Sequence, residues 1–345
     1  MKRTYSFILS LFVVAMTMVS CSDDDNVTQS SLAEITDFTL DFTGLEADDV
    51  DYDLGTDITV SVPYGTSLIG VIPAISISEN ASISPASGEA ITFEDGVAKT
   101  FTVTAEDGST KQYTVTVNVR PEVGSGSRIQ TYTKSLDLGG FALEDSWSYE
   151  YDENSGFVNK YSVSEAFTET VIYTLIYDDK NQVIEKTAEG QRTVYTYEDG
   201  IITKAEEFED QELKYTFEYT YNDDDLMVRE ERTNHQGDEP VLDDLKTYEY
   251  DANGNVTKYI TGTAQSENNT FTASYDTKNN PFRSIYPKAF AAISVSGFDG
   301  VNTNNAIIRD DAEVSYEYNS DDYPVESSYS TSEAVITNTF TYYAE

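Results

Sequence analysis

The sequence predicts an all-β protein, and three observations support that prediction. Runs of alternating apolar and polar residues, the period of a half-buried strand, recur along the chain. Gly, Pro, Asn and Asp interrupt these runs at short intervals. An aromatic pair at positions i and i+2, such as Tyr248 and Tyr250, returns throughout the carboxyl-terminal two-thirds. We therefore expect an amino-terminal β-sandwich followed by a large antiparallel β-meander that curls or closes into a barrel-like shell.

Composition limits which partners the protein can have. The 345 residues include 62 acidic and 21 basic side chains, for a formal net charge of −41. Such a chain repels phosphate backbones, so we expect no nucleic-acid partner. Disordered acidic chains are poor in aromatics, whereas this chain has 26 Tyr and 16 Phe, so we expect a folded monomer with an acidic surface. The single Cys rules out an intrachain disulfide framework.

Residues 1–20 are typical of a processing signal. Lys2 and Arg3 precede an apolar run at residues 7–19, which is shorter than the about 20 residues that a membrane-spanning helix needs. The run ends just before Cys21, the only cysteine. This pattern resembles the bacterial lipoprotein signal, which implies that Cys21 is acylated and anchors the chain in a membrane. An ordinary signal peptide with an incidental Cys is the alternative.

A short acidic segment follows the cysteine. It consists of Ser22, Asp23, Asp24 and Asp25. An acidic triplet after a lipid-bearing Cys resembles the surface-export signal of Bacteroidetes-type lipoproteins, which implies an outer-membrane protein that faces the extracellular side. The alternative is a solvated acidic tether, because acidic residues are frequent throughout this chain. Residues 21–34 are polar, and we expect them to form a flexible tether.

Residues 35–120 are predicted to form the first folded domain. Its alternating runs span residues 36–42, 57–62, 75–77, 90–93, 100–105 and 112–119. Short strands at this density, separated by turns such as Asp107-Gly108, are typical of a β-sandwich. The stretches 62–66, 84–88 and 101–115 resemble immunoglobulin-like modules of Bacteroidetes surface lipoproteins. That resemblance implies a spacer or stalk.

Beyond a predicted Gly/Ser linker at residues 121–130, residues 131–345 repeat one hairpin-like phrase. An aromatic pair is followed by an acidic or amide-rich turn and then by an apolar residue. The second tyrosine of the phrase falls at Tyr151, Tyr177, Tyr197, Tyr221, Tyr250, Tyr275, Tyr318 and Tyr342. Spacing of about 24 residues fits two strands with two connections. Because sheets twist, a meander of about fourteen or more strands must curl or close.

The repeat also carries a resemblance. The Tyr-Asp-x-x-Gly-x-x-x-Lys pattern resembles the tyrosine–aspartate repeats of bacterial surface and toxin shells. The stretch Tyr275–Phe282 resembles, more specifically, a family of Bacteroidetes lipoproteins with a porin-like β fold. The resemblance covers about residues 145–345 and implies no particular activity and no catalytic residues. The polar second face of the strands favours a soluble barrel over a membrane barrel.

Few side chains are candidates for catalysis. His235, the single histidine, lies in a polar loop and is expected to be solvated, and the chain has no Gly-x-Ser-x-Gly elbow. We predict no catalytic residue, no metal site and no cofactor, although a carboxylate pair of the glycosidase kind stays open. Two function classes remain. The first is a surface binding or adhesion protein with a glycan or protein ligand, and the alternative is a surface glycan hydrolase.

One step of the repeat is longer than the others. From Tyr275 to Tyr318 the chain advances by 43 residues, and Pro287–Ile293 within this step is predicted to be a short helix. We expect residues 280–305 to plug one end of the β shell. The plug is either purely structural or forms a ligand groove with nearby strand tyrosines. Its candidate ligand-binding residues are Phe282, Tyr286 and Phe290.

Overall fold

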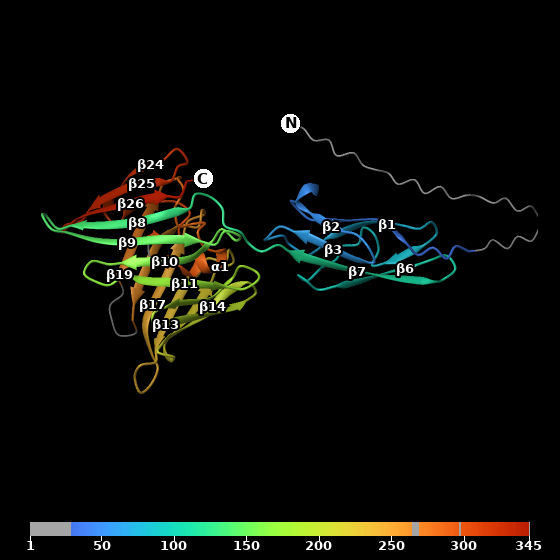
Figure 1. Ribbon diagram of the computed structural model, residues 1–345, viewed down its shortest axis with the longest axis horizontal. Helices are drawn as coiled ribbons and strands as arrows, with labels where there is room; N and C mark the ends of the chain where they lie inside the picture. Colours follow the sequence, from blue (N-terminus) through green and yellow to red (C-terminus); the bar gives the residue numbers. More distant parts are fainter. Residues whose placement is uncertain (1–28, 264–268, 297, 345) are drawn as a thin grey trace, which may run out of the picture. The chain divides into compact units, whose positions relative to one another are not determined.

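The computed structural model describes residues 29–263, 269–296 and 298–344. They form two compact units, one of residues up to 61 and 67–118, and the other of residues 62–66 and 119 onward. Nearly all regular elements are strands, so the predicted all-β class is confirmed (Figure 1). The signal segment 1–20, Cys21 and the acidic segment Ser22–Asp25 lie outside the described residues. In the described ranges, no helix has the length and hydropathy that crossing a bilayer requires.

The first unit consists of two small antiparallel sheets. Its elements are β1 (Ile35–Asp41), η1 (Ala47–Asp49), β2 (Asp51–Asp53), β3 (Asp57–Val62), β4 (Ile72–Ile77), β5 (Ser82–Ser84), β6 (Lys99–Thr104) and β7 (Thr110–Val119). One sheet pairs β1 with β4, and the other has the order β2-β3-β7-β6-β5. Phe38 of β1 packs edge-on against Phe101 of β6, with ring centroids 6.0 Å apart. The two sheets therefore share one apolar core, as expected of a sandwich.

One predicted strand of this unit is wrong. Residues 90–93 form only an isolated bridge, in which the backbone of Ile91 exchanges two hydrogen bonds of 2.8 Å with Val71. The alternation there reflects the burial of Ile91 and Phe93 rather than a paired strand. The short strands β2 and β5, each of three residues, were missed because so few residues show no period.

The second unit is a closed antiparallel barrel of 17 strands. Its strands are β8 (Ile129–Asp137), β9 (Ala142–Tyr151), β10 (Val158–Ser164), β11 (Val171–Tyr177), β12 (Val183–Ala188), β13 (Gln191–Glu198), β14 (Ile201–Glu209), β15 (Glu212–Tyr221), β16 (Met227–Asn234), β17 (Val241–Tyr250), β18 (Val256–Gly262), β19 (Asn269–Tyr275), β22 (Ala306–Arg309), β23 (Ala312–Glu313), β24 (Ser315–Tyr318), β25 (Pro324–Ser330) and β26 (Val335–Tyr342). They follow one another around the ring in chain order, and β26 pairs with β8 to close it. The predicted meander is confirmed as a closed shell.

The acidic or amide residue of the repeated phrase builds its turn. The Asp251 carboxylate accepts backbone N–H bonds from Asn253, at 2.8 Å, and from Asn255, at 3.0 Å. Gly254 supplies the positive φ of +80° within this turn. Equivalent side-chain acceptors are Asp152, Asp178, Asn222 and Asn319. Asp and Asn recur here because their short side chains bond their own backbone two to four residues on.

The second tyrosine of the phrase ties neighbouring hairpins together. The Tyr221 hydroxyl donates to the Ile202 carbonyl at 2.5 Å, and the Tyr250 hydroxyl donates to the Met227 carbonyl at 2.6 Å. We call the tyrosines that make this contact the rim tyrosines: Tyr151, Tyr177, Tyr197, Tyr221, Tyr250, Tyr275 and Tyr342. Each acceptor is an apolar residue of the preceding hairpin or strand, and together these contacts define one end of the barrel, the tyrosine rim.

Tyr318 departs from this pattern. Its hydroxyl donates to the Asp276 carboxylate, and Tyr316 instead donates to the Ala306 carbonyl at 2.9 Å. The departure falls beside the long step in the repeat, where β22, β23 and β24 are the short strands of the ring. The regular spacing therefore fails where the insert joins the barrel.

Residues 279–304 are inserted into one rim turn. Asp276 accepts N–H bonds from Lys278 and Asn305, both at 3.0 Å, and its own N–H donates to the Asn305 carbonyl at 3.1 Å. The insert contains α1 (Lys288–Ile293), β20 (Val295–Ser296) and β21 (Asp299–Gly300). The predicted helix is confirmed, with Pro287 as its N-cap. Ile285, just before the helix, and Phe290, within it, are buried in the main core cluster of the barrel, as expected of a plug.

The stretch predicted as a linker is bonded to the tyrosine rim. The Gly124 N–H donates to the Ser155 carbonyl at 2.7 Å, and the Glu122 carbonyl accepts from the Asn181 side chain at 2.7 Å. A Cβ on Gly124 would lie 2.4 Å from the Gly156 carbonyl oxygen. Glycine is needed at position 124 because the backbone there passes so close to the turn at Gly156.

Candidate binding site in the barrel lumen

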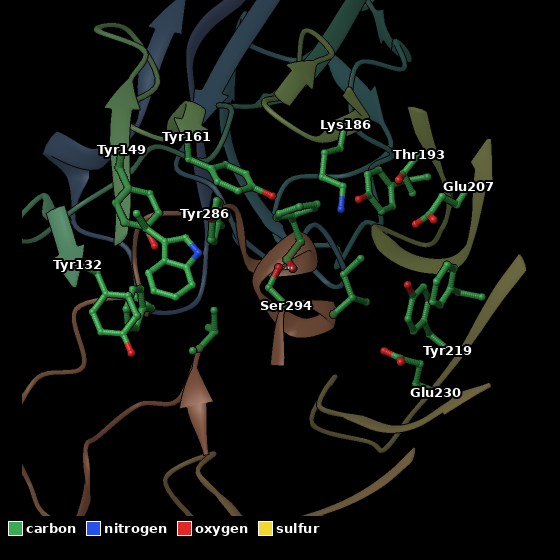
Figure 2. Close-up of a pocket in the computed structure, with 18 residues that line it drawn as sticks. Tyr132, Tyr149, Tyr161, Lys186, Thr193, Glu207, Tyr219, Glu230, Tyr286 and Ser294 are labelled. Carbon is green, nitrogen blue, oxygen red and sulfur yellow. Dashed lines mark hydrogen bonds between the residues drawn. The ribbon is translucent and has the colours of Figure 1, made fainter. Parts of the chain in front are cut away.

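The barrel interior contains a half-open cavity beside the insert. Its volume is about 480 Å³, within the range of about 300–1,000 Å³ that small-molecule sites occupy. Strands β8 to β16 supply most of its wall, and the insert supplies the rest (Figure 2). Ten of the lining residues are aromatic: Tyr132, Trp147, Tyr149, Tyr161, Tyr195, Phe217, Tyr219, Phe282, Tyr286 and Phe290.

One wall of the cavity is an aromatic ladder across β8 to β10, and the ladder continues to Tyr173 of β11 beyond the cavity lining. Tyr132 pairs with Trp147 across the strands, with ring centroids 4.8 Å apart. Tyr149 pairs with Tyr161 at 6.3 Å, and Tyr161 stacks in turn on Tyr173 at 4.8 Å and 15°. Such cross-strand aromatic pairs stabilise the sheet and present their remaining surface to the lumen.

A second wall carries charged side chains. Lys186 on β12 lies opposite Thr193 on β13, which in turn lies opposite Glu207 on β14. Glu230 on β16 lies opposite Tyr219 on β15. Figure 2 shows these groups on the same side of the cavity, with Tyr219 between the two glutamates in the view.

Most charges near this wall are paired with each other. Lys246 binds Glu230 at 2.8 Å and Asp244 at 3.5 Å. Beside them, Arg232 binds Asp243 at 2.9 Å. Within the described ranges, no hydrogen bond or ion pair is found for the Lys186 and Glu207 side chains, and the Lys186 ammonium group lies 5.7 Å from the centroid of the Tyr173 ring. These two groups of opposite charge are therefore available to a ligand.

Burial shifts the pKa values of several side chains that line the cavity. It raises the pKa of Tyr149, Tyr219 and Tyr286 well above the ordinary tyrosine value, so these phenols are neutral donors at neutral pH. Burial also lowers the pKa of Lys186, and the nearby Glu207 charge opposes that shift. Burial makes the charged form of Lys186 unfavourable, and a hydrogen-bond acceptor on a ligand would offset that penalty.

The three candidate residues of the insert all line this cavity. Phe282 packs edge-on against Tyr132 at 5.4 Å, and Phe290 packs edge-on against Tyr195 at 5.3 Å. Tyr286 lies against Phe290 at 5.2 Å. The structure thus brings the three together with strand tyrosines, and their role in binding stays a prediction.

Other expected or possible site residues fall elsewhere. His235 follows β16, and its Nε2 lies 2.9 Å from Thr216 Oγ1, away from the cavity lining. In the part of the chain that the structure describes, no three His, Cys, Asp or Glu side chains are grouped so that they could hold a metal ion.

Sequence reasoning missed the charged members of the site, Lys186, Glu207 and Glu230. A signal for one of them exists, because Glu207 lies two residues after the buried Ala205 and so falls on the inward face of β14. A charged residue at a position where the alternation predicts an inward-facing apolar residue is the signal that could have identified Glu207.

Comparisons with known proteins give matches to solved structures and to one family model. It is similar to a porin-like protein from Bacteroides uniformis, with 12% identity, a TM-score of 0.43, and coverage of 63% of this chain and 99% of that one. It is also similar to a porin-like protein from Bacteroides vulgatus, with 11% identity, a TM-score of 0.30, and coverage of 64% and 100%. No curated protein matches the sequence. Residues 35–117 match the family model described as SGBP, N-terminal, the amino-terminal domain of surface glycan-binding proteins.

Proposed function

We propose that this protein is a lipid-anchored surface protein that binds a glycan in the lumen of its barrel, with the amino-terminal domain as a stalk. The observation that supports this most is the cavity itself, where an aromatic ladder meets a wall that carries Lys186 and Glu207. The match of residues 35–117 to the SGBP amino-terminal family supports the same class of ligand.

The cavity has the chemistry that a sugar needs. A pyranose ring has an apolar face of C–H groups and an edge of hydroxyl groups. The apolar face packs on aromatic rings such as Trp147 and Tyr161. The hydroxyls accept from Lys186 and donate to Glu207, and charged partners make the stronger hydrogen bonds.

Binding is favoured over hydrolysis by the state of the carboxylates. A glycosidase needs two acidic side chains with separate roles at the scissile bond. Glu230 is committed to an ion pair with Lys246 at 2.8 Å. Glu207 alone is unpaired in the cavity wall, so the site has a ligand acceptor rather than a second catalytic acid.

The only tryptophan of the chain gives a direct test. Trp147 lines the cavity and stacks on Tyr132, so its fluorescence should change when a sugar enters. Purified protein would be titrated with linear gluco-, manno- and xylo-oligosaccharides while Trp147 emission and the release of reducing sugar are measured. Saturable emission changes without turnover support binding. Turnover would favour the hydrolase, and an unchanged emission with every glycan would refute a lumen site.

Anchoring and surface display belong to the same proposal. Acylation at Cys21 would hold the chain in the outer membrane, and the acidic segment Ser22–Asp25 would direct it to the extracellular side. Cys21→Ala should move the protein from the membrane pellet to the soluble fraction. Protease added to intact cells should remove the native protein, and a variant with Ala at positions 23–25 should be protected. A native protein that is protected from the start would contradict surface display.

A further inference from the structure

The insert closes the barrel at the tyrosine rim. The Ile285 carbonyl accepts the Val158 N–H of β10 at 3.0 Å, and the Asn302 side chain accepts the Val256 N–H of β18 at 2.9 Å. In the ring of 17 strands, β10 and β18 are eight strands apart, so they lie on opposite sides of the barrel. The insert therefore spans the lumen from wall to wall and is bonded to both sides.

The barrel wall offers no side entrance in the neighbourhood of the cavity. Each strand from β8 to β17 is paired with the next, with a single register shift in most of the pairings, and β26 pairs with β8 from Val335 to Tyr342. A glycan has no path between hydrogen-bonded strands. With the insert across one end, a glycan would have to enter and leave through the opposite rim.

We propose, resting on the proposed function, that the lumen captures the end of a glycan chain, and that Lys186 and Glu207 bond the hydroxyls of its terminal sugar. A polymer that ran through the site would need two openings or a lateral groove. A cavity that ends on Tyr286 and Phe290 of the insert accepts only a chain that stops there. The aromatic ladder then packs against the ring faces of that end.

The charges of the site indicate a neutral terminal sugar. Lys186 is a donor and Glu207 an acceptor, so the pair suits a ligand that offers both functions, as adjacent hydroxyls do. An anionic sugar would meet the Glu207 and Glu230 carboxylates and a chain of net charge −41. An amino sugar would meet the Lys186 ammonium group.

The chain provides matched controls for the two key residues. Lys204 and Glu206 form an ion pair of 2.9 Å, and their side chains remain 40% and 34% exposed on the outer face of β14, whereas Glu207 of the same strand faces the cavity. Lys186→Met and Glu207→Gln should each weaken binding at least about tenfold, the loss of roughly one charged hydrogen bond. Lys204→Met and Glu206→Gln should leave the affinity unchanged.

Stoichiometry separates an end-binding site from a site along the chain. Protein would be titrated calorimetrically with linear oligosaccharides of increasing length from the series that changes Trp147 emission, and with the corresponding cyclic oligosaccharide. End capture predicts one protein per chain at every length, no binding of the cyclic sugar, and weaker binding when the terminal sugar is altered chemically.

Three results would decide the question. More proteins per chain as the length grows, or binding of the cyclic sugar, would overturn end capture while leaving glycan binding intact. Unchanged affinity of Lys186→Met and Glu207→Gln would overturn their role. Absence of binding to every linear series would overturn the proposed function and end capture together. If the circular dichroism spectra of the two variants match that of the native protein, a loss of affinity is not caused by a loss of fold.

Discussion

In three of the repeated phrases, the two tyrosines lie in different regions of the barrel. Tyr221 belongs to the tyrosine rim and donates its hydroxyl to a main-chain carbonyl of the preceding hairpin. Tyr219, two residues earlier on the same strand, lines the lumen cavity. The same division separates Tyr151 from Tyr149 and Tyr197 from Tyr195.

The difference shows that the two tyrosines of one phrase have different roles. The hydroxyl of a rim tyrosine satisfies a buried carbonyl and ties two hairpins together, which is an architectural role. The lumen tyrosine needs only its ring to complete the wall, and its hydroxyl is available to a ligand. We therefore expect rim positions to respond in stability and lumen positions to respond in affinity.

The largest expected effect comes from the plug that closes the tyrosine rim. Phe290→Ala removes a buried ring that packs against Tyr195 and Tyr286, and it should reduce the free energy of unfolding by about 3–5 kcal/mol. Chemical denaturation followed by circular dichroism measures this loss. Phe167→Ala is the control, because that ring is 87% exposed on the opposite rim and its removal should change stability little. Equal losses in the two variants would contradict a packed plug.

A smaller effect should separate the two tyrosines of one strand. Tyr221→Phe leaves the buried Ile202 carbonyl without its donor and should reduce the free energy of unfolding by about 1–3 kcal/mol. Tyr219→Phe removes a hydroxyl that faces the cavity and should leave stability nearly unchanged while weakening glycan binding. Urea denaturation and the Trp147 titration together measure both quantities. If Tyr219→Phe were the more destabilising change, the division into rim and lumen would be wrong.

A third prediction concerns the lumen at different pH. Burial lowers the pKa of Lys186 below its ordinary value of 10.5, so the unfolded chain binds the proton more tightly than the folded one. Burying the charged lysine therefore lowers stability at neutral pH, and this loss is recovered as pH rises from the lowered, folded pKa to the unfolded value of 10.5. Lys186→Met should be more stable than the native protein at neutral pH, and the gap should narrow in alkali. Denaturation midpoints across pH test this; a variant less stable at neutral pH would contradict the sign.

The smallest effect is expected in a rim turn. Hydrogen bonds from the backbone of Ser155 and Asn154 lower the pKa of Asp152 below its ordinary value of 3.8. Its contribution to stability is present above that pH and is lost as pH falls through the lower, folded value. Asp152→Asn keeps the acceptor, as Asn222 does in another turn, and should change neutral stability slightly while removing this acid dependence. Acid denaturation curves of the two proteins would then converge at low pH.

Features with a local cause were predictable from the sequence. The alternation of Phe217 to Tyr221, the turn at Asp251 and the helix after Pro287 each depend on neighbouring residues. The repeat spacing then indicated the meander, because hairpins of similar length pair in chain order.

The charged side of the cavity was not predictable in the same way. Register irregularities occur at most rim turns, for example between Thr196 and Tyr197, and each changes the phase of the alternation. Which inward residues meet across the lumen depends on the stagger of the whole ring. Lys186 lies on β12 and Glu207 on β14, with β13 between them, so no pattern within a single strand joins the two residues.

The turn at Asp276 shows how a barrel of this design can acquire new parts. Its hydrogen bonds to Lys278 and Asn305 repeat those of Asp251 to Asn253 and Asn255, although residues 279–304 intervene. The turn keeps its bonds whether the intervening segment is one residue or many. We therefore expect each remaining rim turn of this kind to accept an inserted segment. A protein engineer could exchange the floor of the lumen, and so its specificity, while leaving the strands untouched.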